Sequence, residues 1–275
     1  MCTVLAWAGK LPKGFISRWL IQAEARGRDA TGIAFRSSPT TSSISRRSIP
    51  ASLFVHEHDD VLKSARKSPR GIAHTRHASR GNPINARNAH PFTYLHTVFA
   101  HNGYIHNYEE IRNSLIVSTK ADLEASPTSD TLKKKLAYLE GCTTDSMVIG
   151  PFIDANDFSS LVGDMGLVWM RGSNVMCMRT KKELSVCTVN WWSEDSPDAH
   201  YSVTLAASTN AIIDNALAHT PGIDYVDEYY NVEEAHVYRL EDADLIDLGT
   251  VAVNPGNTHD DFSSGKIDQE YDAGS

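Results

Sequence analysis

Cys2 is the first residue whose type and position suggest chemistry. It follows Met1, and its side chain is small enough for Met1 to be trimmed, which leaves Cys2 with a free α-amino group. An α-amine has an unperturbed pKa of about 7.7–8.0, so a useful fraction is unprotonated near neutral pH. That amine can take the thiol proton directly or through a water molecule, without a histidine base. Cys2 is therefore a candidate nucleophile, although a cysteine can also follow methionine without any role.

Two further polar signals stand at the ends of predicted strands. Arg76 lies near the end of a strand predicted over 70–78, where its guanidinium can hold a carboxylate through two parallel hydrogen bonds. Asn102 and Gly103 follow the apolar run HTVFA. An Asn-Gly pair is typical of a β-hairpin turn, but its side-chain amide and backbone N–H can also form an oxyanion hole. Taken alone, the pair leaves both interpretations open.

Five motifs follow one another within the first 103 residues. They are Cys2, R-G-x-D over 26–29, H-T-R over 74–76, N-A-H-P over 88–91 and H-N-G over 101–103. Their order resembles the glutaminase domain of the class II glutamine amidotransferases, a branch of the N-terminal nucleophile hydrolases. The resemblance extends over roughly 2–245, more loosely after the fifth motif. It implies an enzyme that removes ammonia from the side-chain amide of glutamine, with no cofactor and no metal.

The resemblance also implies roles for the matching residues. Cys2 would attack the γ-amide carbon and form a γ-glutamyl thioester that water hydrolyses. Asn102 and Gly103 would stabilise the oxyanion. Arg76 would bind the α-carboxylate of glutamine, and Ser79 would line the same pocket.

An aspartate within a T/S-D-T/S motif would hold the α-ammonium group of the substrate. Two such motifs occur, centred on Asp130 and Asp145. Asp145 is favoured because the segment after it keeps the family's order of elements, at the cost of an insertion over 113–129. Arg26 and His90 are implied as supporting residues, Arg26 behind the N-terminal strand and the nucleophile.

Apolar patterns predict the elements that position these residues. A buried strand over 2–8 precedes a helix over 12–26, and the second half is strand-rich. The serine- and proline-rich segment 36–50 is predicted to be a mobile loop, followed by a strand over 51–56. Helices followed by many antiparallel strands favour an α+β fold. The resemblance implies the four-layer αββα sandwich of two antiparallel sheets, the Ntn-hydrolase fold.

Composition limits the remaining possibilities. The net charge of −8, without a long basic run, argues against direct nucleic-acid binding. Four scattered cysteines do not form a disulfide framework, and neither a signal peptide nor an 18-residue apolar run occurs. We therefore expect a cytoplasmic protein without membrane contact, with a glutaminase domain over 2–250. The acidic segment 251–275 is expected to be a disordered tail.

Alternative functions remain at this stage. Eight histidines lie between His56 and His106, but their spacing matches no zinc motif, so no metal is predicted. Glutamine is the expected substrate. Because no second domain follows in the chain, we expect a separate synthase-type partner that accepts the ammonia. A stand-alone hydrolase of γ-glutamyl amides in peptides or thiol metabolites stays open, as does an inactive binding subunit with the same fold.

Overall fold

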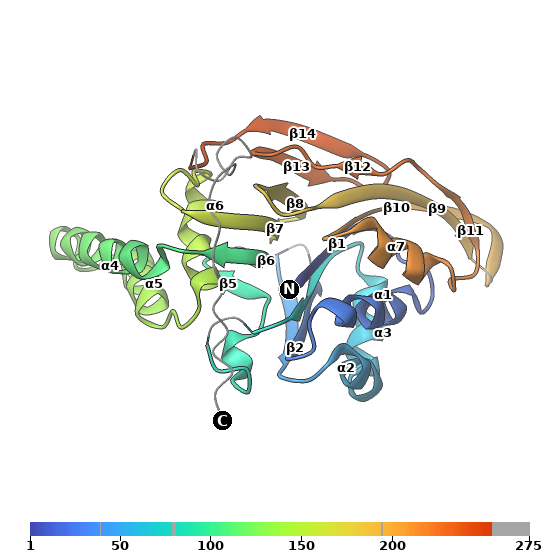
Figure 1. Ribbon diagram of the computed structural model, residues 1–275, viewed down its shortest axis with the longest axis horizontal. Helices are drawn as coiled ribbons and strands as arrows, with labels where there is room; N and C mark the ends of the chain where they lie inside the picture. The colour runs from blue at the N-terminus through green and yellow to red at the C-terminus, as the bar shows by residue number, and fades with distance from the viewer. Residues whose placement is uncertain (39, 79–80, 194, 255–275) are drawn as a thin grey trace, which may run out of the picture.

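The computed structural model describes residues 1–38, 40–78, 81–193 and 195–254 (Figure 1). Its strands form two sheets in which all neighbouring strands are antiparallel. The first sheet contains β1 (Thr3–Gly9), β2 (Ala30–Arg36), β3 (Ser42–Arg47), β4 (Arg70–Arg76), β9 (Ser185–Ser193), β10 (Ser196–Ala207), β11 (Ile223–Val226) and β12 (Tyr230–Asn231). The second contains β5 (Phe92–Tyr94), β6 (Thr97–Ile105), β7 (Gly163–Arg171), β8 (Asn174–Arg179), β13 (His236–Leu240) and β14 (Leu245–Thr250).

The strand order places β1 in the interior of its sheet. The first sheet runs β11-β9-β10-β1-β4-β2-β3, with β12 paired to β9, and the second runs β14-β13-β8-β7-β6-β5. The first sheet is covered by α1 (Phe15–Ala23), α2 (Ala51–Glu57), α3 (Asp59–Lys67) and α7 (Asn210–Leu217), which lie together at the lower right of Figure 1. The short helices η3 (Asp145–Ile149) and α6 (Gly150–Ala155) cover the second sheet.

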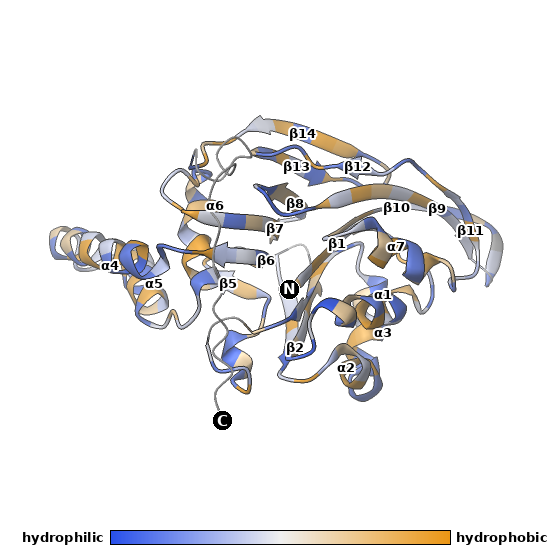
Figure 2. Cartoon of the chain, in the orientation of Figure 1, coloured by the Kyte–Doolittle hydropathy of each residue, from blue (hydrophilic) through white to orange (hydrophobic). Residues whose placement is uncertain are grey.

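Alternating side chains along β1 divide the core into layers. Leu5 and Trp7 pack against the helices of the first sheet, whereas Val4 and Ala6 face the second sheet. A third apolar cluster joins the outer face of the second sheet to η3 and α6. Figure 2 shows apolar residues gathered along the strands and on the helices beneath the first sheet. The predicted four-layer αββα sandwich is therefore confirmed.

Two local predictions were wrong. The segment 36–50, predicted to be a loop, contains the edge strand β3, which pairs with β2 from Arg36–Ser42 to Thr31–Arg47. An edge strand needs a hydrogen-bonded neighbour on one side only, so polar residues suffice to form it. The segment 51–56, predicted to be a strand, belongs to α2, because Ala51 and Phe54 are buried at helical spacing.

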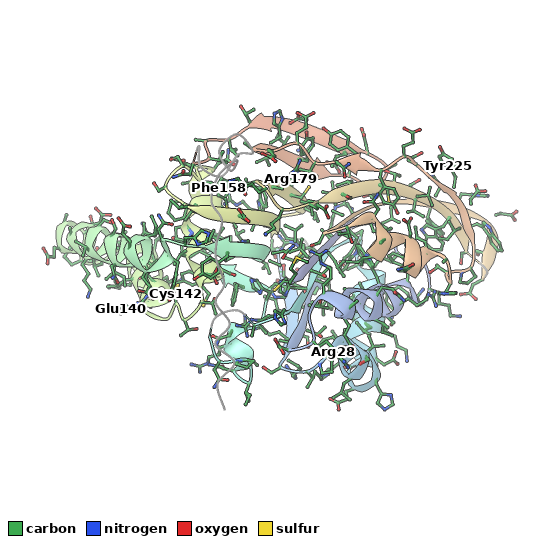
Figure 3. The ribbon with its side chains drawn as sticks, viewed as in Figure 1. Arg28, Glu140, Cys142, Phe158, Arg179 and Tyr225 are labelled. Atoms are coloured by element: carbon green, nitrogen blue, oxygen red, sulfur yellow. The ribbon has the colours of Figure 1, made fainter. Side chains whose placement is uncertain are left out.

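Two further predicted features, the Asn102–Gly103 pair and the insertion over 113–129, lie in regular secondary structure. β6 continues through both residues, which pair with Gly166 and Met165 of β7, so no hairpin turn occurs there. The predicted insertion over 113–129 lies within a helical hairpin of α4 (Tyr108–Ala125) and α5 (Asp130–Glu140), which projects from the body at the left of Figure 1. Figure 3 places Cys142 at its base, where the chain returns to the body.

The predicted tail over 251–275 falls mostly outside the described residues, which end at Asn254. Within the described part, the Phe158 N–H donates a hydrogen bond to the Ala252 carbonyl, and Phe158 forms an isolated bridge with Val253. These contacts attach the start of the segment to the body beside the second sheet.

Candidate active site

The register of three strands brings Cys2 beside Arg76. Thr3, the first residue of β1, pairs with Thr75 of β4, and Ala30, the first residue of β2, pairs with Arg76. The beginning of β1 and the end of β4 are therefore neighbours in the sheet. Antiparallel pairing thus brings together residues that are far apart in sequence.

The Cys2 thiol lies against the backbone just beyond β4. Its Sγ accepts a hydrogen bond from the His77 N–H at 3.3 Å, and the thiol lies 3.4 Å from the His77 carbonyl oxygen. Burial raises the pKa of the Cys2 thiol, while the His77 amide, the N-terminal ammonium and Arg76 act in the opposite direction. Because burial dominates, the thiol needs a base to become a nucleophile.

Opposite charges surround the sulfur. Arg76 is 4% exposed and Asp145 is 5% exposed. Arg76 favours the thiolate form of Cys2, and Asp145 opposes it. Burial lowers the pKa of Arg76, whereas Cys2, Asp29 and Asp145 raise it. The Asp145 carboxylate also accepts the Ile105 N–H at 3.0 Å, which fixes it at the end of β6. The site therefore combines a thiol, a cation and an anion in one buried region.

Arg26 and Asp29 hold the backbone around the thiol. Arg26 Nε donates to the Cys2 carbonyl at 3.3 Å. The Asp29 N–H donates to the Arg76 carbonyl at 2.9 Å, and its carboxylate accepts the Ala78 N–H at 2.6 Å. Gly27 must be glycine for this path, because a Cβ there would lie 2.5 Å from the Arg76 carbonyl carbon. The R-G-x-D motif thus holds the backbone in two places, at Cys2 and just beyond Arg76.

Asn102 reaches the first sheet through Ser208. Asn102 Nδ2 donates to Ser208 Oγ at 3.3 Å, and the same oxygen accepts the Val4 N–H at 3.0 Å. Gly103 has φ of 153°, and a Cβ there would lie 1.8 Å from the Asp164 carbonyl oxygen. This backbone shape requires glycine at the position proposed to supply an oxyanion N–H.

Three buried histidines join the two sheets behind these residues. His74 Nε2 lies 3.1 Å from the His101 carbonyl oxygen, and the His74 and His90 rings are 4.0 Å apart. His101 Nδ1 lies 3.0 Å from Ser146 Oγ, which is next to Asp145. Burial lowers the pKa of His74 to about 3 and also lowers the pKa values of His90 and His101. All three are therefore neutral at neutral pH.

The remaining predicted residues have simple outcomes. Asp130 is exposed at the first position of α5, whereas Asp145 lies beside Cys2 and Arg76. Ser79 lies outside the described residues.

Within the described ranges, no group of three His, Cys, Asp or Glu side chains is arranged to hold a metal ion. None of the helices that the structure describes is both long and apolar enough to cross a membrane.

The chain is similar to curated glutamine–fructose-6-phosphate aminotransferases. It is 32% identical over 118 residues to a glutamine–fructose-6-phosphate aminotransferase of Mycolicibacterium paratuberculosis, covering 42% of this chain and 19% of that protein. The corresponding protein of Shouchella clausii is 31% identical over 154 residues, covering 54% and 24%. The matched part thus spans about a fifth to a quarter of the length of these relatives. No family model matches the chain.

Solved structures extend the similarity to the whole fold. A glutamine phosphoribosylpyrophosphate amidotransferase from B. subtilis superimposes with a TM-score of 0.54 and 16% identity, covering 90% of this chain and 50% of that one. The chain therefore has the fold of this amidotransferase. A second structure, described as the allosteric regulatory enzyme of purine biosynthesis, has a TM-score of 0.55 at 15% identity, covering 90% of this chain and 48% of that one. At such identities the superpositions concern the fold.

Within this fold, three contacts were absent from the sequence-based predictions. Ser208 connects Asn102 to β1, His74 contacts the strand that carries Asn102, and Asp29 orients the backbone beyond Arg76. Asp29 belongs to the R-G-x-D motif, so a signal existed. Ser208 is 106 residues from Asn102, and no local pattern connects them.

Proposed function

We propose that this chain is a glutaminase that hydrolyses the side-chain amide of glutamine through Cys2. The observation that carries the proposal is the placement of Arg76 and Asp145, which both act electrostatically on the Cys2 thiol. Free glutamine carries an α-carboxylate and an α-ammonium, so this pair of charges matches its two ends. A charge-assisted hydrogen bond to each group would orient the γ-amide toward the sulfur.

The proposed reaction begins after removal of Met1, whose 71% exposure leaves it open to an aminopeptidase. The α-amine of Cys2 takes the thiol proton, and the sulfur bonds to the carbonyl carbon of the glutamine side-chain amide. The Asn102 amide and the Gly103 N–H stabilise the resulting oxyanion. Collapse of this intermediate expels ammonia, which takes the proton from the α-ammonium, and leaves a thioester. Water then attacks the thioester with the same amine as base, releasing glutamate and restoring the thiol.

We further propose that the ammonia passes to a separate synthase-type protein. The curated relatives are named as aminotransferases that use fructose 6-phosphate, and the chain matches only a part of each. Ammonia released into water is protonated and diffuses away, so transfer requires an acceptor close to Cys2. Purification of the untagged chain from its host is expected to retain this acceptor. Equal turnover with and without the co-purified protein would argue for a stand-alone amide hydrolase.

The proposal predicts glutamine hydrolysis by the chain carrying a tag only at its C-terminus. Glutamate and ammonia should appear from L-glutamine in equal amounts, and mass spectrometry should show an N-terminal peptide that starts at Cys2. An N-terminal extension blocks the amine and should abolish the reaction. Full activity of protein that retains Met1 would contradict the proposed base. A γ-glutamyl peptide cleaved much faster than glutamine would contradict the proposed substrate.

A second prediction concerns the α-ammonium ligand. Asp145→Asn preserves size but removes the charge, so we expect kcat/KM for glutamine to fall at least about 30-fold, since losing one partner of a buried charge pair costs about 2–5 kcal/mol. The matched control is Asp130→Asn, which changes the exposed aspartate of the other T/S-D-T/S motif. Steady-state kinetics of both variants distinguishes them. Equal effects, or loss only in Asp130→Asn, would reverse the assignment.

A further inference from the structure

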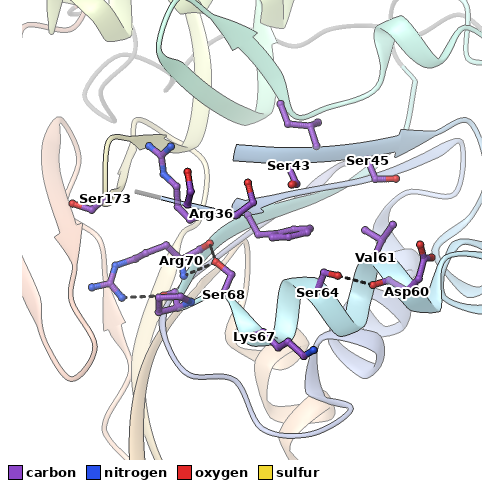
Figure 4. Close-up of a pocket in the computed structure, with 15 residues that line it drawn as sticks. Arg36, Ser43, Ser45, Asp60, Val61, Ser64, Lys67, Ser68, Arg70 and Ser173 are labelled. Atoms are coloured by element: carbon purple, nitrogen blue, oxygen red, sulfur yellow. Dashed lines mark hydrogen bonds between the residues drawn. The ribbon is translucent and has the colours of Figure 1, made fainter. Parts of the chain in front are cut away.

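A cavity of about 780 Å³ lies at the opposite end of β4 from the candidate active site (Figure 4). Its walls come from the end of β2, from β3, from α3 and from the start of β4. Arg70 at the cavity and Arg76 at the active site are six residues apart, which is about 20 Å along a strand. The volume lies within the range of about 300–1,000 Å³ that is usual for small-molecule sites.

Arg36 is the unusual residue of this cavity. Its side chain is partly buried, and its Nε atom is buried without a hydrogen-bond partner. Burial lowers the pKa of Arg36, and the guanidinium forms no ion pair in the part of the chain that the structure describes. A neighbouring cavity of about 440 Å³ is also lined by Arg36. An N–H donor that is buried without an acceptor is costly, and an anion bound at this guanidinium would relieve that cost.

The other charges around the cavity leave Arg36 as the principal anion site. Arg70 is already paired with Glu241 and Asp242. Lys67 adds a second cation at the exposed edge, and within the described residues it forms no ion pair. Asp60 is the one carboxylate of the described lining, and it lies beside Val61 on α3, away from Arg36 in Figure 4. The net charge near Arg36 is therefore positive, although the net charge of the whole chain is negative.

The uncharged lining suits an amphipathic ligand. Phe35 and Val61 provide an apolar surface. Ser43 and Ser45 stand two residues apart on β3 and pair with Phe35 and Ile33 of β2, so their hydroxyl groups lie on the same face of the sheet as Phe35. Arg36 projects from the opposite face at the end of β2. Neither hydroxyl forms a hydrogen bond within the part of the chain described here, so both are available as donors. A guanidinium is suited to a phosphate or sulfonate, whose oxygens accept several hydrogen bonds, and the serine hydroxyls can bond to polar atoms of the ligand body.

We propose that this cavity binds a small molecule that combines an apolar or aromatic body with a phosphate-like anion. The anion pairs with Arg36 at the end of β2, while the body lies against Phe35 and Val61 beside the serine hydroxyls of β3. None of these residues belongs to the proposed glutamine site. The site is thus a second binding site on the chain, and it does not depend on the glutaminase proposal.

The test uses phenyl phosphate as probe, titrated by calorimetry into the full-length protein. Phenyl phosphate should bind, and inorganic phosphate alone and phenol alone should each bind at least 10-fold more weakly. Arg36→Gln should weaken phenyl phosphate binding at least 10-fold. Arg47→Gln is the matched control, because Arg47 is an exposed arginine of β3 that bonds only to the neighbouring Arg46 carbonyl among the described contacts. It should leave binding unchanged.

A second variant protects the test against a folding defect in Arg36→Gln. Ser45→Asp places a carboxylate on the same wall and should weaken phenyl phosphate by charge repulsion, with an unaltered circular dichroism spectrum. Glutamine turnover should persist in both variants, because neither residue contacts the proposed glutamine site. Undetectable binding of phenyl phosphate to the wild type would overturn the proposal. So would equal binding to wild type, Arg36→Gln and Ser45→Asp.

Discussion

Cys2→Ala is expected to abolish glutamine hydrolysis, with a fall in kcat of about 10⁴-fold or more, the scale seen when an enzyme loses its nucleophile. The variant keeps its α-amine, Arg76 and Asp145, so glutamine should still bind. The thiol contributes two contacts to the His77 backbone, and their loss is too small to unfold the sandwich. Coupled assay of glutamate release measures the loss, and calorimetric titration with glutamine measures the binding that remains.

Cys142→Ala is the matched control for this variant. Cys142 is a buried cysteine at the base of the helical hairpin, and burial raises the pKa of its thiol to about 12. Such a thiol is not a nucleophile near neutral pH. We expect Cys142→Ala to retain turnover with a modest loss of stability. Glutamate release by Cys2→Ala at a rate comparable to that of wild type would refute the mechanism.

A strong loss of stability is expected on acidification below about pH 6.5. His74 has a folded-state pKa of about 3, and burial also lowers the pKa values of His90 and His101. In the unfolded chain these histidines titrate near pH 6.5. Between the folded and unfolded values the unfolded state binds more protons, so the free energy of unfolding falls as the pH falls. At neutral pH and above, this contribution to stability is fully present.

The expected slope is about 1.4 kcal/mol per pH unit for each histidine that stays neutral in the fold. Over two pH units, each such group would therefore remove a substantial share of a typical total stability of about 5–15 kcal/mol. Carboxylates contribute at lower pH, since their unfolded pKa values lie near 4. The loss between pH 6.5 and 5 therefore reports mainly on the histidines.

Urea unfolding between pH 5 and 7.5 measures this slope. His90→Phe is an informative variant, because neither His90 ring nitrogen has a hydrogen-bond partner among the described residues and the ring packs at a tilt against His74 and Phe92. The slope of its unfolding free energy with pH should fall by the contribution of one histidine, about 1.4 kcal/mol per pH unit. Replacement of the exposed His56 by glutamine should leave the slope unchanged. An identical slope in His90→Phe and wild type would show that His90 does not contribute.

The positions of the candidate residues could be predicted in part because each belongs to a short sequence motif. Arg76 could be placed at the end of a strand from its sequence, and β4 ends at that residue. The fold class followed from the order of motifs together with the strand-rich second half. Asp145 was preferred over Asp130 from the order of elements alone, and the structure places Asp145 beside Cys2. Local patterns thus carried the main features of the site.

Features that depend on tertiary pairing were not predictable. β3 consists largely of serine and arginine, and it is a strand because β2 offers it an edge. The histidines look like ordinary polar residues in the sequence, yet they are buried because the two sheets close over them. The bridge from Asn102 through Ser208 to Val4 joins three distant strands or strand ends. In each case the partner is remote in sequence, so no local pattern identifies it.

The position of β1 between β4 and β10 sets the order of events during synthesis. β1 acquires one neighbour when β4 emerges from the ribosome, but its other neighbour ends at Ala207. At about 5–20 residues per second, that second pairing is delayed by roughly 10–40 s after translation begins. A ribosome-associated aminopeptidase can therefore act on Met1 while Cys2, the proposed nucleophile, still lies on an incomplete sheet, long before the proposed glutamine site is complete.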